Sequence, residues 1–270
     1  MQKKSGFFWV LAGVLLLTSC SKFRRIEKSE DWRVKYEAGL NYYAKKDYYR
    51  TAVLFEQVQP IVRGLPEGEK VEFYLAYCQY YEKTYLLASN QFKIFYETYG
   101  RSPLAEEATF MYAYSLYASS PDTNLDQTSS VDAMAAMQNF LNRYPASKFR
   151  EQAVAVIQES QVKLERKGFE NAKQYLKLRY YQAAVIAFEN FKKNFPDSQY
   201  LEEAAFFKLQ AQFLLAENSL PNKQYERYNA TLGYYRELLE NFPNSPLLKD
   251  AQRLFTASQE QVNKLKPKNS

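Results

Sequence analysis

The sequence contains no histidine, and only 8 of its 270 residues are glycine. Without histidine the chain cannot build Ser-His-Asp or Cys-His catalytic machinery or the usual zinc ligand sets. The scarcity of glycine disfavours loops that bind phosphate groups. The 30 carboxylates include no pair flanked by the glycine loops or tight turns of active sites. No motif favours an enzyme, and we expect a non-enzymatic protein without a metal or cofactor.

Cysteine is nearly absent as well, with Cys20 and Cys78 the only two. Cys78 lies in "YLAYCQYY", where a small apolar group packed among aromatic residues is expected. Cys20 follows the only long apolar run of the sequence. If that thiol is modified, Cys78 has no partner and an intrachain disulfide cannot form.

The amino terminus has the three-part layout of a secretory signal. Lys3 and Lys4 give a basic start, and residues 6–17 ("GFFWVLAGVLLL") form an apolar run. This run is shorter than the roughly 20 residues that a membrane span needs. Small residues and Cys20 follow it, so we expect a signal peptide over residues 1–19.

Leu17, Thr18, Ser19 and Cys20 ("LTSC") resemble the lipobox of bacterial lipoproteins. The resemblance implies that Cys20 carries a diacylglycerol and an N-acyl chain, and that no other cofactor is present. Several acyl chains would make membrane anchoring stable. Ser21 replaces the aspartate that retains many such proteins at the inner membrane, which implies the periplasmic face of the outer membrane. The alternative is an ordinary signal peptide whose cleavage region happens to contain a cysteine.

The net charge of the chain is modest. Removing Lys3 and Lys4 from the formal net charge of +6 leaves +4 for the mature protein. A basic chain with 24 tyrosines is compatible with single-stranded nucleic acid binding. The secretory start places nucleic acid out of reach, so we expect none as a ligand.

One phrase recurs four times after residue 98. It is an aromatic residue, Gly or Pro, any residue, Ser, and Ala six residues after the Ser. The four copies are "YGRSPLAEEA" at 99, "YPASKFREQA" at 144, "FPDSQYLEEA" at 195 and "FPNSPLLKDA" at 242. The Gly or Pro is expected to end a helix, and the Ser to cap the next one. Such repetition is typical of stacked helical units.

A second pattern precedes each of these helix ends. A small residue stands twelve positions before the Gly or Pro, and large residues stand eight and five positions before it. These offsets place all three on one helical face. The sets are Ala88, Phe92 and Phe95; Ala133, Met137 and Phe140; Ala184, Phe188 and Phe191; and Thr231, Tyr235 and Leu238.

These patterns resemble the tetratricopeptide repeat, with residues 165–198 and 69–102 in the best register. The resemblance implies an all-α, tetratricopeptide-like α-solenoid of about five helix pairs plus a carboxy-terminal cap helix. We expect a lipidated tether at 20–30, the solenoid at 31–266 and a tail at 267–270. Longer loops are expected at "SSPDTNLDQTSS" and "NSLPNKQYERY". The expected helices are 31–45, 48–59, 69–82, 84–99, 103–119, 128–144, 147–178, 181–194, 198–217, 223–241 and 245–265.

The first helix of each pair would line the concave face of such a stack, where peptides and protein surfaces bind. An aromatic groove of this kind would hold an extended segment that bears aromatic side chains. The same residues would instead belong to the core if neighbouring helices cover them. The candidate binding residues are Asn41, Phe73, Tyr77, Tyr80, Tyr81, Glu107, Met111 and Tyr114.

The whole arrangement is similar to the BamD family of outer-membrane assembly lipoproteins. The signs are the start "YEAGLNYYAKKDYYRTAVLFEQV" close to the lipobox, the "YG-S" and "FP-S" helix ends, and the long link from 147 into "YYQAAVIAFENFKKNFPDSQY". The resemblance implies a non-enzymatic scaffold of the β-barrel assembly machinery. Its implied partners are a BamA-like barrel subunit on the carboxy-terminal repeats, other assembly lipoproteins, and unfolded β-barrel substrates on the amino-terminal repeats.

Two other functions fit the same features. A pilotin-like lipoprotein would use the stack to escort secretin subunits, and a periplasmic scaffold would gather cell-wall enzymes on it. An enzyme with an unrecognised site is a third alternative. The insertion at 119–130 and the excess of tyrosine are departures from the family pattern, and no family contact residue is assigned.

Overall fold

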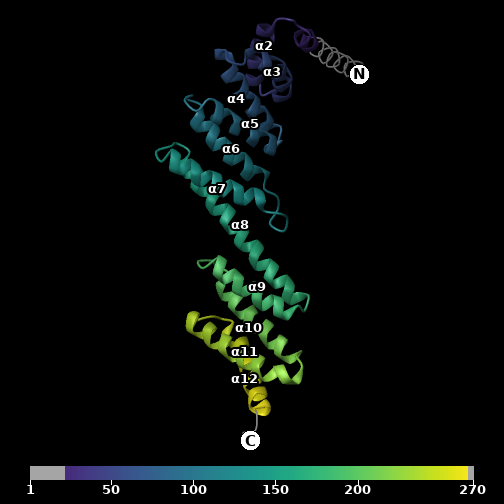
Figure 1. Cartoon of the computed structure of the whole chain (residues 1–270), viewed down its shortest axis with the longest axis vertical. Helices are drawn as coiled ribbons and strands as arrows, with labels where there is room; N and C mark the ends of the chain where they lie inside the picture. Colours follow the sequence, from purple (N-terminus) through teal and green to yellow (C-terminus); the bar gives the residue numbers. More distant parts are fainter. Residues whose placement is uncertain (1–21, 267–270) are drawn as a thin grey trace, which may run out of the picture. The chain divides into compact units, whose positions relative to one another are not determined.

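The computed structural model describes residues 22–266 (Figure 1). These residues are all-α, as predicted, and none of them lies in a strand. The chain divides into two compact units. The first comprises the described residues of Met1–Pro121 and Asp126–Ser160, and the second comprises those of Asp122–Leu125 and Gln161–Ser270.

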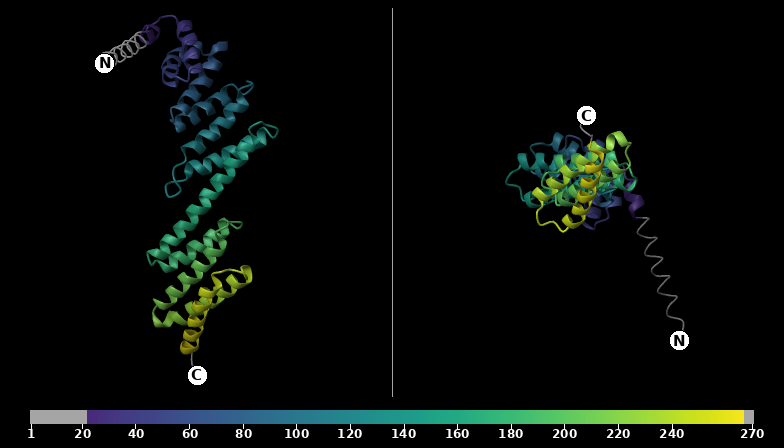
Figure 2. Two further views of the ribbon diagram at one scale, coloured as in Figure 1. Left: turned by 180° about the vertical axis from the view of Figure 1, so that it is seen from behind. Right: turned by 90° about the horizontal axis from the view of Figure 1, so that it is seen from below.

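Consecutive helices pair as antiparallel neighbours within each unit (Figures 1 and 2). The helices are α2 (Trp32–Ala44), α3 (Tyr48–Val62), α4 (Pro66–Tyr81), α5 (Tyr85–Thr98), α6 (Ala105–Ser119), α7 (Thr128–Arg143), α8 (Arg150–Lys177), α9 (Tyr181–Asn194), α10 (Leu201–Glu217), α11 (Pro221–Asn241) and α12 (Leu248–Leu265). Over residues 32–265 they make five pairs and a final helix, which confirms the predicted fold. The long helix α8 begins in the first unit and ends in the second.

The second helix of each repeated pair turns its small-large-large face into the core. The small residues of this pattern are fully buried, and every large one is at most 8% exposed. Burying a large apolar side chain stabilises the fold by about 2 kcal/mol. The alanines of the helix-ending phrases are buried too, which lets adjacent helices approach closely: Ala108, Ala153, Ala204 and Ala251. The predicted register of these helices is therefore confirmed.

The helices that follow the serines of the four phrases begin later than predicted. Each hydroxyl accepts a hydrogen bond from the amide two residues on, as in the bond of 2.9 Å from Leu104 N to Ser102 Oγ. The corresponding bonds involve Ser147, Ser198 and Ser245 at 3.0–3.3 Å. A tight turn follows each serine, so the α-helix begins three residues after it. The predicted starts at 103, 147, 198 and 245 are wrong by two or three residues.

Three further helix boundaries that lie near a proline differ from the prediction. Helix α4 starts at Pro66 and α11 at Pro221, because proline at the first helical position needs no amide partner. Most of the predicted loop "NSLPNKQYERY" is therefore helical, and residues 218–220 alone connect α10 to α11. Helix α3 continues through Pro60 to Val62, three residues beyond its predicted end.

Candidate functional site

The first helices of neighbouring pairs in the first unit are joined through their tyrosines. The hydroxyl of Tyr77 on α4 donates a hydrogen bond of 2.6 Å to Oε1 of Glu107 in the first turn of α6. The carboxylate of Glu107 lies 3.7 Å from Nζ of the exposed Lys148. This bond fixes the orientation of the Tyr77 ring between the two pairs.

A continuous series of ring contacts runs from α2 to α6 through Tyr81 and Tyr80. Tyr81 stacks on Tyr48 with ring centroids 4.2 Å apart, and on Tyr77 at 5.9 Å. Tyr80 contacts Tyr81 at 5.6 Å and reaches Tyr114 of α6 at 6.2 Å. Such aromatic pairs each contribute about 1 kcal/mol beyond their burial. The tyrosine row, as we call it, comprises Tyr43, Tyr48, Tyr77, Tyr80, Tyr81, Tyr114 and Tyr117.

The two ends of the tyrosine row are also held in place. Tyr43 of α2 packs against Tyr48 at 5.7 Å and against Tyr74 of α4 at 4.4 Å. At the other end, Tyr117 contacts Tyr114 at 5.8 Å, and its hydroxyl donates a hydrogen bond to the carboxylate of Glu159 on α8. The row is thus built into the framework of the first unit.

The hydroxyls of Tyr77, Tyr80 and Tyr117 remain protonated over the physiological range. Burial raises the pKa of Tyr80 to about 12. The hydrogen bond to Glu159, followed by burial, raises the pKa of Tyr117 to about 12. Burial and the hydrogen bond to Glu107 raise the pKa of Tyr77 as well. These three residues therefore present neutral rings with hydroxyl groups.

The candidate residues divide into three groups. Tyr77, Tyr80, Glu107 and Tyr114 are half-buried, and Tyr81 is 45% exposed. Their ring contacts and the Tyr77–Glu107 hydrogen bond join these five on one surface. Phe73 and Met111 are only 4% and 7% exposed, and they lie in the core of the first unit. Their expected exposure is wrong, because the rings of Tyr77, Phe92 and Phe95 cover Phe73, and Met111 lies in the same cluster.

Asn41 lies apart from the tyrosine row. It is exposed on α2 and lines a hollow of about 280 Å³ together with Lys22, Tyr42, Lys45 and Arg50. Its neighbour Tyr43 joins the tyrosine row instead. A shift of two residues along α2 turns a side chain through about 200°, so Asn41 and Tyr43 lie on different faces of the helix. A role of Asn41 in binding stays a prediction.

Three members of the row were not predicted from the sequence: Tyr43, Tyr48 and Tyr117. Tyr117 stands three residues after Tyr114, and this helical spacing would have indicated a shared face. Tyr48 was missed because it begins the second helix of its pair, and the groove was assigned to first helices alone. Its stacking on Tyr81 joins residues 33 positions apart, which no local spacing indicates.

Two further findings concern the described part of the chain. None of the helices α2–α12 combines the length and the apolar character that a membrane crossing needs. Residues 22–266 contain no cluster of three or more side chains suited to hold a metal ion. Cys20, the predicted lipidation site, lies outside the described residues. Cys78 is a free thiol buried in the first unit, as predicted, and burial raises its pKa to about 12.

The fold and the row define an all-α protein of tetratricopeptide-like helix pairs with an aromatic surface on its first unit. The profile of the family described as YfiO, outer membrane lipoprotein, matches residues 29–227. The putative outer membrane protein assembly factor BamD of Aquifex aeolicus is 31% identical over 217 residues, 80% of this chain and 71% of that protein. The outer membrane protein assembly factor BamD of Caulobacter vibrioides is 26% identical over 179 residues, 66% of this chain and 55% of that protein.

The chain belongs to the YfiO outer membrane lipoprotein family. The predicted resemblance to the BamD family is thereby confirmed, and the matched residues include parts of both units. The match begins at residue 29, so the amino-terminal segment with Cys20 lies outside it.

Proposed function

We propose that this chain is a scaffold lipoprotein of the machinery that inserts β-barrel proteins into the outer membrane. In this role it has no catalytic activity, and Cys20 with its acyl chains holds it at the periplasmic face. The family assignment supports membership, because both relatives are named as outer membrane protein assembly factors. Its partners are a BamA-like barrel subunit, other assembly lipoproteins and unfolded β-barrel substrates.

The observation that carries the proposal is the tyrosine row on the first unit. An incoming barrel protein presents extended segments with alternating side chains before it folds. Tyr81 and its half-buried neighbours offer wide, rigid ring surfaces that lose little entropy on binding. Because the ring contacts and the Tyr77–Glu107 bond orient the row in advance, ordering it on binding costs little. The row therefore suits an extended segment that bears aromatic side chains.

Identification of the partners tests the function. We would solubilise native membranes after mild crosslinking, capture the chain, and identify the bound proteins by mass spectrometry. A BamA-like barrel subunit in stoichiometric amount is the expected result. A secretin in its place would indicate a pilotin, and peptidoglycan synthases would indicate a cell-wall scaffold. Either of these two results would overturn the proposal.

A photoreactive residue tests the site separately. With p-benzoyl-phenylalanine in place of Tyr81, we expect adducts with unfolded barrel proteins during their synthesis. The matched control is the same replacement at Tyr49, which lies in the same unit and is 66% exposed, outside the tyrosine row. Equal adduct yields at the two positions would remove the row from substrate binding while leaving membership of the machinery intact.

A further inference from the structure

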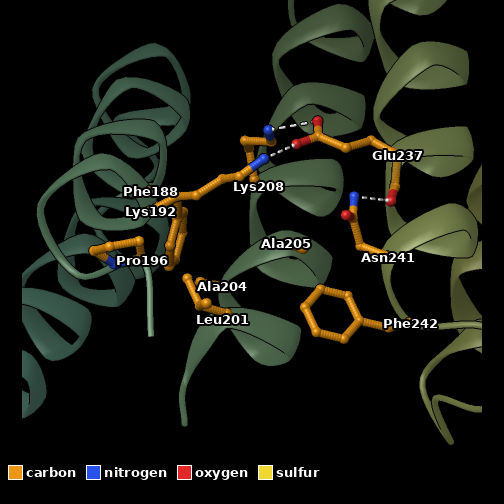
Figure 3. Close-up of a pocket in the computed structure, with 10 residues that line it drawn as sticks. All are labelled: Phe188, Lys192, Pro196, Leu201, Ala204, Ala205, Lys208, Glu237, Asn241 and Phe242. Carbon is orange, nitrogen blue, oxygen red and sulfur yellow. Dashed lines mark hydrogen bonds and ion pairs between the residues drawn. The ribbon is translucent and has the colours of Figure 1, made fainter. Parts of the chain in front are cut away.

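The second unit contains a cavity of about 210 Å³ among α9, α10 and α11 (Figure 3). One side of it is apolar and comprises Phe188, Pro196, Leu201, Ala204, Ala205 and Phe242. The other side is charged and comprises Lys192, Lys208 and Glu237, with Asn241 beside them. The cavity thus combines an apolar floor with a polar edge.

The charged edge is a fixed ion cluster. Nζ of Lys208 lies 2.8 Å from Oε2 of Glu237 and 2.9 Å from Oε2 of Glu189. Nζ of Lys192 lies 2.6 Å from Oε1 of Glu237. Burial alone would lower the pKa of Lys208, but the hydrogen bonds to Glu237 and Glu189 outweigh it and raise that pKa. The two lysines in turn lower the pKa of Glu237, so Lys208 and Glu237 are both charged at neutral pH.

The repeat pattern shows how the same place is filled elsewhere in the chain. Lys192 stands four residues before the helix-ending Pro196, and Lys208 stands twelve after it. Tyr96 and Tyr112 stand at the same offsets from Gly100, and their rings pack together at 5.8 Å. The corresponding pairs at the other two helix ends are Leu141 with Ile157 and Leu239 with Phe255.

The second unit is therefore hollow where the first unit holds two phenol rings. Apolar or aromatic pairs take these positions in three of the four repeats, whereas the Pro196 repeat has two lysines. Their ammonium groups are drawn to Glu189 and Glu237, so neither lysine side chain covers the apolar floor as a ring would. The cavity therefore suits an apolar or aromatic side chain, which the other three repeats have at these positions and this repeat lacks.

We propose that this cavity is a socket for one tyrosine side chain carried by a protein partner. Its volume is below the 300–1,000 Å³ typical of cofactor and small-molecule sites, and it suits a single anchoring side chain. The ring packs on Phe188, Leu201 and Phe242. The hydroxyl donates to the carboxylate of Glu237, which has room for a further hydrogen bond beside its two lysines.

Tyrosine is favoured over phenylalanine by the chemistry of the edge. A neutral hydroxyl donor joins the ion cluster without bringing another charge out of water. The chain uses the same bond elsewhere, from Tyr77 to Glu107 at 2.6 Å and from Tyr117 to Glu159. A phenylalanine would leave the edge of the cavity without that donor.

The nature of the partner, a folded protein of the assembly machinery, rests on the proposed function. The socket itself does not. The experiments are therefore chosen so that the socket is measured without any partner, and the partner is identified in a separate step.

The first experiment titrates the lipidated full chain with N-acetyl-tyrosinamide and records amide shifts by NMR. We expect saturable shifts confined to α9, α10 and α11, with an affinity about fivefold higher than that for N-acetyl-phenylalaninamide. The absence of saturable shifts in these helices would overturn the socket. An equal or higher affinity for the phenylalanine probe would overturn the choice of tyrosine.

Filled variants test the place of binding. Lys192→Tyr combined with Lys208→Tyr restores the pair found at Tyr96 and Tyr112, and we expect it to abolish the shifts. Ala205→Phe fills the cavity independently and keeps the result readable should the double variant fail to fold. Lys193→Tyr is the matched control, because Lys193 is exposed on the same helix and does not line the cavity. Retained binding in the folded filled variants would overturn the site.

The second experiment identifies the occupant in native membranes. With p-benzoyl-phenylalanine in place of Asn241 at the cavity edge, we expect one adduct whose partner peptide contains a tyrosine near the crosslink. An adduct with a second copy of this chain, or with peptides that lack tyrosine, would overturn the occupant. A tyrosine adduct from a protein outside the assembly machinery would uphold the socket and contradict the proposed function.

Discussion

Lys208 is a buried charged residue of the second unit. Its side chain is 5% exposed, whereas Glu237 and Glu189 are 30% and 58% exposed. An ammonium group in such a place is stable only if its hydrogen bonds to carboxylates offset the lost hydration. The three side chains therefore make unequal contributions to stability, although they form one cluster.

Replacing Glu237, a partner of Lys208, should lower the free energy of unfolding more than replacing Lys208 itself. We expect Glu237→Gln to destabilise the chain by about 2–4 kcal/mol, because it leaves Lys208 buried with Glu189 alone. Lys208→Met should cost within about 1 kcal/mol, since an apolar side chain replaces the ion cluster. Glu189→Gln should cost below about 1 kcal/mol, because Glu189 is largely exposed. Urea denaturation measures the three values, and a larger loss for Lys208→Met than for Glu237→Gln would contradict this ranking.

The same cluster predicts a dependence of stability on pH. Burial would raise the pKa of Glu237, but hydrogen bonds from Lys192 and Lys208 lower it below its ordinary value of 4.5. Its contribution is fully present above 4.5 and is lost as the pH falls through the folded pKa. The pKa of Lys208 is raised above 10.5, so its contribution is lost only as the pH rises through that higher value.

We therefore expect the wild type to lose more stability than Lys208→Met between pH 5 and the acid limit of folding. The reason is that the variant lacks one of the two lysines that lower the pKa of Glu237. Thermal unfolding of both proteins at a series of pH values checks this. Parallel curves for the two proteins below pH 4.5 would show that the cluster does not contribute to acid sensitivity.

At the scale of the element, the turns between the two helices of three pairs share one conformation. Lys46, Lys83 and Arg179 have φ values of 60°, 62° and 63°, in the left-handed region that favours glycine. In each turn the next residue donates its amide to a carbonyl five residues earlier, as Tyr180 does to Tyr175 at 2.9 Å. This hydrogen bond is the helix-ending Schellman arrangement, here without its usual glycine.

Arg179→Gly should therefore stabilise the chain. A non-glycine residue at this φ costs about 1–2 kcal/mol, and glycine loses part of that gain through unfolded-state entropy, so we expect about 0.5–1 kcal/mol. Gln174→Gly is the matched control, because Gln174 is exposed inside α8, where glycine should cost about 1 kcal/mol. Melting temperatures of both variants measure the effect. A lower melting temperature for Arg179→Gly would mean that its side chain matters more than its backbone.

At the scale of the whole molecule, the proposed function depends on the chain remaining at a membrane. None of the described helices could hold it in a bilayer by crossing it. The lipobox-like "LTSC" predicts instead that acyl chains on Cys20 anchor the chain. Multiple acyl chains give stable membrane attachment, whereas a single one gives marginal binding.

Cys20→Ser should prevent acylation and release the chain from the membrane fraction. Ser21→Ala is the control, because it keeps the acceptor thiol beside it. Fractionation of the native host followed by immunoblotting checks the distribution. If Cys20→Ser still sediments with the outer membrane as the control does, the anchor lies elsewhere in the chain.

Much of the architecture was predictable from local spacing. A small residue followed by large ones at offsets of four and seven specifies a buried helical face, and the structure buries all of them. The helix-ending phrases located the turns, since Gly100, Pro145, Pro196 and Pro243 disfavour continuation of a helix. The helix starts were less well predicted, because the serines bond the amide two residues on and precede a tight turn.

The candidate site was predictable only in part. Tyr77, Tyr80, Tyr81, Glu107 and Tyr114 share a surface, and their helical spacing had indicated one. Phe73 and Met111 have the same spacing but lie beneath that surface. A helical period says which residues share a direction, whereas the neighbouring helices decide which of them are covered.

The sequence by itself determined the helix pairs, their core faces and the family, because these depend on contacts between residues close together in the chain. Only the tertiary structure decided the stacking of Tyr48 on Tyr81 and the pairing of Lys208 with both Glu189 and Glu237. The carboxylates that hold Lys208 come from helices on either side of α10, 19 and 29 residues away. Packing of separate helices brings such groups together, and the periodicity of the sequence does not predict these contacts.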